Sequence, residues 1–135
     1  MKMLTFAGAA LAILVAAPAT AEDFDGSKKL RCFAGEMLQC APADTCHRAT
    51  PEDLDFPVFF DVDFENKRIG GRTASGRAAS SAIQRIAKEP RATVIQGLEH
   101  GRAWSMLIDT ATGRLSGAAS ESGGGFVLFG ACQPL

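Results

Sequence analysis

Four cysteines are the residues of this chain with the most definite chemistry: Cys32, Cys40, Cys46 and Cys132. An even number of cysteines favours disulfides if the compartment is oxidising. Zinc is the alternative, but their spacing lacks the paired C-x2–4-C knuckles of zinc sites. Three pairings are open. We predict a local Cys40–Cys46 clip and a Cys32–Cys132 bond that joins the two ends of the domain.

The N-terminus predicts an oxidising compartment. Lys2 precedes an apolar run over Met3–Ala17, and Ala19-Thr20-Ala21 forms a small-x-small cleavage site. This pattern is typical of a secretory signal peptide, and the apolar run is shorter than the ~20 residues that span a bilayer. We therefore expect residues 1–21 to be a signal peptide and residues 22–135 to form a single domain. The mature chain should be periplasmic or secreted, without a membrane span.

A row of acidic side chains, Asp61, Asp63 and Glu65, falls on one face of an expected strand. Carboxylates bind Ca²⁺, but this row lacks the glycine turn and the ligand number of a calcium loop. We favour cross-strand pairing with basic residues of the next strand, with Asp61 opposite Arg72. We predict no metal site and no cofactor.

The other polar residues form no catalytic pattern. The sequence has no G-x-S-x-G elbow, H-E-x-x-H helix, P-loop or dinucleotide fingerprint. The glycine run at 123–125 precedes a strand, whereas a phosphate cradle needs a helix N-terminus. Both histidines, His47 and His100, fall in expected loops. We therefore predict no catalytic residues and a protein that is not an enzyme.

Charge and aromatic content argue against further classes. Lys and Arg total 14 and Asp and Glu total 15, so the chain has no general attraction for nucleic acid or anionic membranes. The aromatic residues are mainly phenylalanines at strand positions, and tyrosine is absent. This composition disfavours a stacking platform for single-stranded nucleic acid.

Strand signals occupy most of the mature chain. Residues 56–65 alternate apolar and polar side chains, Asn66-Lys67 and His100-Gly101 are typical two-residue hairpin loops, and four apolar runs follow between Ala92 and Cys132. Hairpin signals at roughly ten-residue spacing predict an all-β domain, a single antiparallel barrel or sandwich of about seven or eight strands in meander order. Neighbouring first and last strands would place Cys32 beside Cys132 and close the sheet.

Three segments lack a clear strand pattern. Residues 22–27 are expected to be a frayed arm, and residues 40–57 a proline-rich loop. In residues 70–90, strand, helix and loop all remain open for 74–89. The alternatives are a short amphipathic helix and a flexible polar loop followed by a short strand, Ala82–Ala87, and we favour the strand. The basic side chains of this segment form either a solvated face or a docking surface for an acidic partner. We expect the 92–132 meander to be scaffold, and function to lie in the 40–57 and 70–90 segments.

Several C-terminal motifs carry a resemblance. The runs 101–105 (GRAWS), 112–114 (TGR) and 129–132 (FGAC) before Pro134 resemble a group of small exported bacterial proteins of unknown function, which implies no activity. A fainter likeness is to the periplasmic inhibitors of c-type lysozyme, which are small barrels with a terminal disulfide. In those proteins a Ser-Gly loop enters the lysozyme cleft. The likeness implies that Ser75 and Arg77, in the similar run 74–77, would bind a partner.

These observations predict an exported, non-enzymatic binding module of unknown ligand, with another exported protein as a candidate partner. A periplasmic lysozyme or protease inhibitor and an envelope-associated structural protein are the alternatives. A barrel interior filled with Phe and Trp would favour a protein-binding exterior, whereas an open cavity would favour a small apolar ligand.

Overall fold

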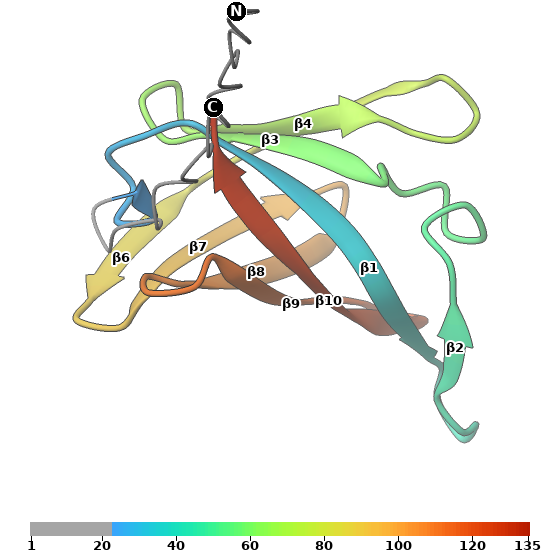
Figure 1. Cartoon of the computed structure of the whole chain (residues 1–135). Helices are drawn as coiled ribbons and strands as arrows, with labels where there is room; N and C mark the ends of the chain where they lie inside the picture. The colour runs from blue at the N-terminus through green and yellow to red at the C-terminus, as the bar shows by residue number, and fades with distance from the viewer. Residues whose placement is uncertain (1–22) are drawn as a thin grey trace, which may run out of the picture.

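The computed structural model describes residues 23–135, which are organised around one antiparallel, curled β-sheet (Figure 1). The all-β prediction is confirmed. The predicted signal peptide, residues 1–21, lies outside the described residues. No helix in residues 23–135 is long and apolar enough to cross a membrane. The strands are β1 (Leu30–Cys40), β2 (His47–Ala49), β3 (Phe59–Asp63), β4 (Arg68–Arg72), β5 (Ala78–Ala82), β6 (Arg85–Glu89), β7 (Ala92–Glu99), β8 (Arg102–Asp109), β9 (Arg114–Glu121) and β10 (Gly124–Pro134).

The strand number and the closure of the sheet differ from the prediction. We expected about seven or eight strands in a barrel or sandwich. The described part of the chain has ten strands, and their order β5-β4-β3-β1-β10-β9-β8-β7-β6 ends at two unpaired edges, with β2 added beside β1. The sheet is therefore a half-barrel that curls without closing through strand pairing.

The 74–89 segment explains part of this difference. It begins as a turn and continues as two strands, so this segment is strand rather than helix, but the expected Ala82–Ala87 strand is interrupted at residues 83 and 84. The chain changes partner between them: the Ile83 N–H donates to the Lys67 carbonyl, and the Gln84 N–H donates to the Gln96 carbonyl, both at 2.8 Å. The buried Ile83 side chain fixes this change. One expected strand thus becomes β5, paired with β4, and β6, paired with β7.

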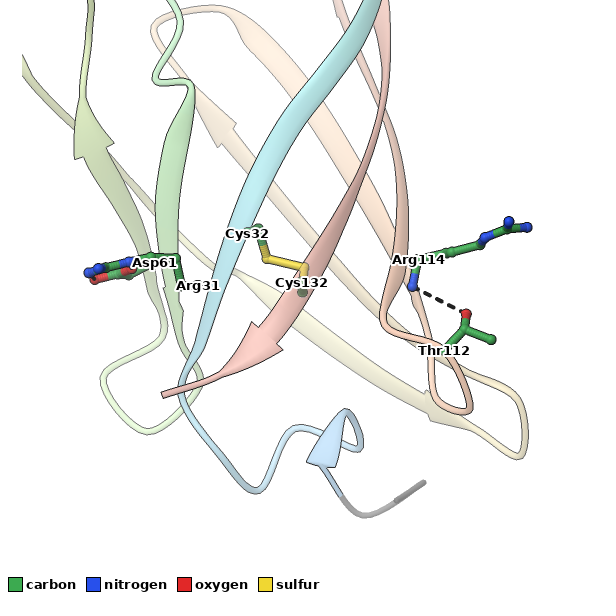
Figure 2. The surroundings of a disulfide bond; sticks show 6 residues. All are labelled: Arg31, Cys32, Asp61, Thr112, Arg114 and Cys132. Atoms are coloured by element: carbon green, nitrogen blue, oxygen red, sulfur yellow. Dashed lines mark hydrogen bonds and ion pairs between the residues drawn. A yellow bond between two sulfur atoms is a disulfide. The ribbon is translucent and has the colours of Figure 1, made fainter. Parts of the chain in front are cut away.

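Both disulfides join the predicted cysteines. Cys32 of β1 and Cys132 of β10 face each other in register, and their bond lies between the two strands (Figure 2). The Cys132 N–H donates to the Gly113 carbonyl at 2.7 Å, on the β9 side. The cysteines therefore form a non-hydrogen-bonded pair, the position at which facing side chains lie closest. Cys40–Cys46 clips the loop between β1 and β2.

The β3–β4 hairpin has a longer loop than predicted, because Asp63 organises its turn. A two-residue loop would place Asp61 opposite Arg72, whereas Asp61 faces Gly70. The Asp63 carboxylate accepts hydrogen bonds from the backbone and side-chain amides of Asn66 at 3.0 and 2.9 Å. A shift of two residues keeps each side chain on its predicted face.

The acidic row therefore pairs with β1 rather than with β4. Asp61 accepts two hydrogen bonds from Arg31, at 2.8 and 3.1 Å, and Figure 2 shows these side chains together beside the sheet. Asp63 lies 3.0 Å from the Lys29 ammonium. The expectation of acid–base pairs on this face is met, with different basic partners.

One end of the curled sheet, here called the closed end, is filled by large apolar side chains. Phe24 is 2% exposed there, and its carbonyl accepts a hydrogen bond of 2.8 Å from Thr93 Oγ1. Its ring occupies the space that a Cβ at Gly113 would need. The expectation of a frayed arm at residues 22–27 is wrong for Phe24, because its side chain completes the core. The other buried residues of this end include Leu30, Cys32, Val62, Ile95, Ile108, Leu115 and Cys132.

We predict that Phe24→Ala lowers the free energy of unfolding by about 3 kcal/mol or more, because it leaves a cavity at the closed end. Urea denaturation of the oxidised protein measures this loss. Phe59→Ala is the matched control: Phe59 is 58% exposed, so the same truncation should cost about 1 kcal/mol or less. Equal losses for the two variants would contradict the role of Phe24 as a core residue.

Candidate ligand cavity

The other end of the sheet, here called the open end, encloses a cavity of about 680 Å³. It lies where the β4–β5, β7–β8 and β9–β10 hairpins meet the end of β1 and residues 54–57. The volume falls within the range of small-molecule binding sites, ~300–1,000 Å³. An open interior, rather than a filled one, is thus the feature that distinguishes the two ends.

Small side chains leave this space unfilled. Ala79 and Ser81 face inward from β5, and Ala119 does so from β9. At the closed end, the corresponding inward positions hold larger residues such as Ile95 and Ile108. Because closely packed interiors need side chains of matching volume, alanine and serine at these positions leave room for a ligand.

Large apolar side chains also contribute to the lining. Phe60, Met106 and Leu128 are almost fully buried, whereas Phe56, Ile69 and Phe126 are only partly buried. Trp104 lies nearer the open end, packed over Gly97, whose missing Cβ makes room for the indole. The Trp104 indole N–H donates to Ser81 Oγ at 2.9 Å, so its polar group is satisfied.

Asp55 organises one side of the rim. Its carboxylate accepts a hydrogen bond of 2.9 Å from Ser75 Oγ, and bonds of 3.2 and 2.9 Å from Arg77 Nε and Nη2. These donors, with Arg77 first, lower the pKa of Asp55 from 3.8 to about 2. The cluster ties the β4–β5 turn to the segment that precedes β3.

Two further ion pairs complete the rim. Arg102 Nε and Nη2 donate to one oxygen of Glu121, at 3.1 and 2.9 Å, and the guanidinium lies 5.8 Å from the centre of the Phe126 ring. His100 Nδ1 lies 3.6 Å from Glu99, a pair that is ionic only when the imidazole is protonated. Two of the three acids of the rim, Asp55 and Glu121, are thus paired with an arginine.

The structure brings Ser75 and Arg77 together, as expected for one loop, but on a carboxylate of the same chain. Cys40 lines the cavity, whereas Cys32 and Cys132 lie at the closed end. Both segments favoured for function, 40–57 and 70–90, contribute to the lining. Residues of the 92–132 meander also line it. Sequence reasoning missed the cavity; the available signal was the small residues at inward positions of β5 and β9.

Within residues 23–135, no three His, Cys, Asp or Glu side chains are grouped so that they could hold a metal ion. Comparison with known proteins gives no relative: no family model, curated protein or solved structure matches the chain.

The lowered pKa of Asp55 predicts a pH-dependent contribution to stability. A carboxyl group whose pKa is lower in the folded chain stabilises it fully above 3.8, and this stabilisation is lost as the pH falls through about 2. The difference in free energy of unfolding between wild type and Asp55→Asn should therefore shrink as the pH is lowered through this window. Urea denaturation at a series of pH values measures it.

Glu52→Gln is the matched control, because Glu52 is an exposed acid of the same segment outside the Asp55 cluster. Its difference from wild type should stay nearly constant over the same pH range. A constant difference for Asp55→Asn as well would show that the Asp55 cluster does not stabilise the fold.

Proposed function

We propose that this chain is an exported, non-enzymatic binding module that holds a small ligand with both polar and apolar groups in the cavity at the open end. The observation that carries this proposal is the cavity of about 680 Å³, which is lined by apolar and polar residues and has charged side chains at its rim. Export is supported by the signal-like pattern of residues 1–21 and by the two disulfides.

The lining supplies the physical basis for affinity. Transfer of apolar surface from water stabilises a complex by about 25 cal/mol per Å². The partly buried side chains of Phe56, Ile69 and Phe126 offer such surface inside a concave site. The Cys40–Cys46 clip and the Asp55 cluster hold parts of the rim in place before a ligand arrives. A site that is ordered in advance loses less conformational entropy on binding.

The alternative of a lysozyme or protease inhibitor has weaker support. It depends on Ser75 and Arg77 reaching a partner, and both side chains are bonded to Asp55. Binding a partner through them would first break these contacts. The envelope-associated structural role has no feature of its own in the described residues, whereas the cavity supports ligand binding directly.

Fluorescence provides a direct test, because Trp104 is the only tryptophan and lines the cavity. The apolar dye N-phenyl-1-naphthylamine should bind at about one site per chain, gain emission and accept excitation energy from Trp104. Ala79→Phe places a large side chain in the cavity and should weaken dye binding by about tenfold or more, a loss of ~1.4 kcal/mol.

Ala82→Phe is the matched control. Ala82 lies on the same strand, is exposed and does not line the cavity, so dye affinity should stay close to that of wild type. Circular dichroism checks that both variants keep the β-sheet. An absence of saturable dye binding by wild type, or equal effects of the two variants, would refute binding in this cavity.

A further inference from the structure

We propose that the cavity ligand is an extended peptide segment that adds to β5 as a further strand. This inference rests on the proposed function and names the ligand class. The backbone of the segment pairs with the free edge of β5, and its side chains on the inner face enter the cavity, which Phe56 and Phe126 line.

The free edge of β5 borders the cavity. β5 ends one side of the sheet, and its only strand partner among the described residues is β4. The cavity is lined by four consecutive residues of this strand, 78–81. Since successive side chains of a strand point to opposite faces, consecutive lining residues indicate that the edge of β5, and not only one face, borders the open space.

Hydrogen bonds at the two ends of the β4–β5 ladder fix its bonding pattern. The Ile83 N–H donates to the Lys67 carbonyl at 2.8 Å, and the Thr73 N–H donates to the Arg77 carbonyl at 3.0 Å. Hydrogen-bonded and non-hydrogen-bonded pairs alternate along an antiparallel ladder. Both end bonds join odd-numbered residues, so the odd-numbered residues of β5 are the ones that bond to β4.

The other residues of β5 carry the backbone groups that are free to bind a ligand. Ala79 and Ser81 direct their N–H and carbonyl groups toward β4, whereas Ala78 and Ser80 direct theirs toward the free edge. Ala78 and Ser80 are two residues apart, which is ~6.6 Å along a strand. An extended peptide presents N–H and carbonyl groups at the same spacing, so it can bond to both residues at once.

The two edges of the sheet differ in their protection against such pairing. β6, at the other edge, contains Arg85, Lys88 and Glu89 and is followed by Pro90. Charged side chains and proline are features that keep other chains from pairing with an edge strand. β5 contains only alanine and serine, so it lacks both features.

The free edge leads into the cavity from a point where β5 meets β7. A Cβ at Gly97 of β7 would lie 2.6 Å from the Ala82 carbonyl oxygen, so the two strands approach closely there. Nearer the open end, residues 78–81 of β5 line the cavity together with Glu99 and His100 of the β7–β8 hairpin. A strand added to β5 at this end would therefore extend the sheet into the cavity.

The strand geometry also predicts the side chains of the segment. Peptide residues opposite Ala78 and Ser80 would point outward as these residues do, and the residue between them would point inward on the side of Ala79. Ala79 is small, and the partly buried Phe56 and Phe126 line the same cavity. We therefore expect a segment of about five residues, the length of β5, with apolar residues at alternate positions.

Competition with the bound dye tests the ligand class. Blocked peptides of the form acetyl-KTXTXTK-amide, in which X is alanine, valine, leucine or phenylalanine, are added at up to ~1 mM to the oxidised protein, residues 22–135. We expect the peptides with large apolar X residues to displace the dye. Each should bind about tenfold or more tightly than its isomer acetyl-KTTXXTK-amide, because the isomer cannot place both X side chains inward.

N-methylated peptides test the backbone pairing without changing the protein. The N–H of the central threonine faces β5 in the proposed complex, so its methylation should weaken binding by about tenfold or more. Methylation of the X residue that follows is the matched control, because its N–H faces away from β5 and most of the affinity should remain. Equal losses for the two peptides would contradict pairing with the edge.

Ser80→Pro tests the same pairing from the side of the protein. It removes a donor at the free edge and spares the ladder with β4, because proline is tolerated in an edge strand where its nitrogen faces outward. Ser80→Ala is the matched control, since it removes only the hydroxyl, which accepts a hydrogen bond of 2.7 Å from Arg68. Ser80→Pro should weaken peptide binding about tenfold more than Ser80→Ala does.

The failure of this inference is distinguishable from the failure of the proposed function. If no peptide displaced the dye while dye binding remained sensitive to Ala79→Phe, the ligand class would be overturned and the cavity would still be a binding site. A loss of specific dye binding in the wild type would overturn both. A dimer, detected by sedimentation, that Ser80→Pro dissociates would assign the edge to a second copy of this chain and overturn the peptide.

Discussion

The pairing of β1 with β10 is the interaction on which the rest of the structure depends. It brings together the first and last long strands, which are far apart in the sequence. β1 then carries β3 at its start and β2 at its end, while β10 carries the meander of β9, β8 and β7. The Cys32–Cys132 bond spans 100 residues at this seam. In the chain-entropy account, such a crosslink destabilises the unfolded chain by roughly 4–5 kcal/mol. The two edge strands of the curled sheet, β5 and β6, are consecutive in the chain and are joined by residues 83 and 84 (Figure 1).

Because a disulfide holds β1 and β10 together, the protein can tolerate an interior that is filled at one end and hollow at the other. The closed end is filled by aliphatic residues and Phe24, and it also contains the Cys32–Cys132 bond. The open end gives up packing at Ala79, Ser81 and Ala119, and every unfilled volume costs stability. Stability and ligand space are therefore separated along the strands, because the same sheet uses large inward residues at one end and small ones at the other.

The parts of the fold that were predictable from sequence depend on local signals. The His100-Gly101 loop fixed the β7–β8 register, including Gly97 opposite Trp104, because a two-residue loop leaves one alignment of the apolar faces. The cysteine pairing followed from strand parity. The predicted β3–β4 register was wrong because hydrogen bonds from Asn66 to the Asp63 side chain stabilise a longer turn. The alternation of apolar and polar residues carries no information about these bonds. The predicted number of strands was wrong because the backbone changes its hydrogen-bond partner between Ile83, which bonds to Lys67, and Gln84, which bonds to Gln96.

The cavity and its rim could not be predicted from the sequence, for a related reason. Small residues in strands are ambiguous, since alanine and serine serve equally on a solvated face and in an empty interior. Only the curl of the sheet brings Ala79, Trp104 and Met106 to the lining of one cavity, and only the fold places Asp55 beside Ser75 and Arg77. The same contacts have two consequences: they tie separate segments into one rim, and they consume the charges that would attract an ion.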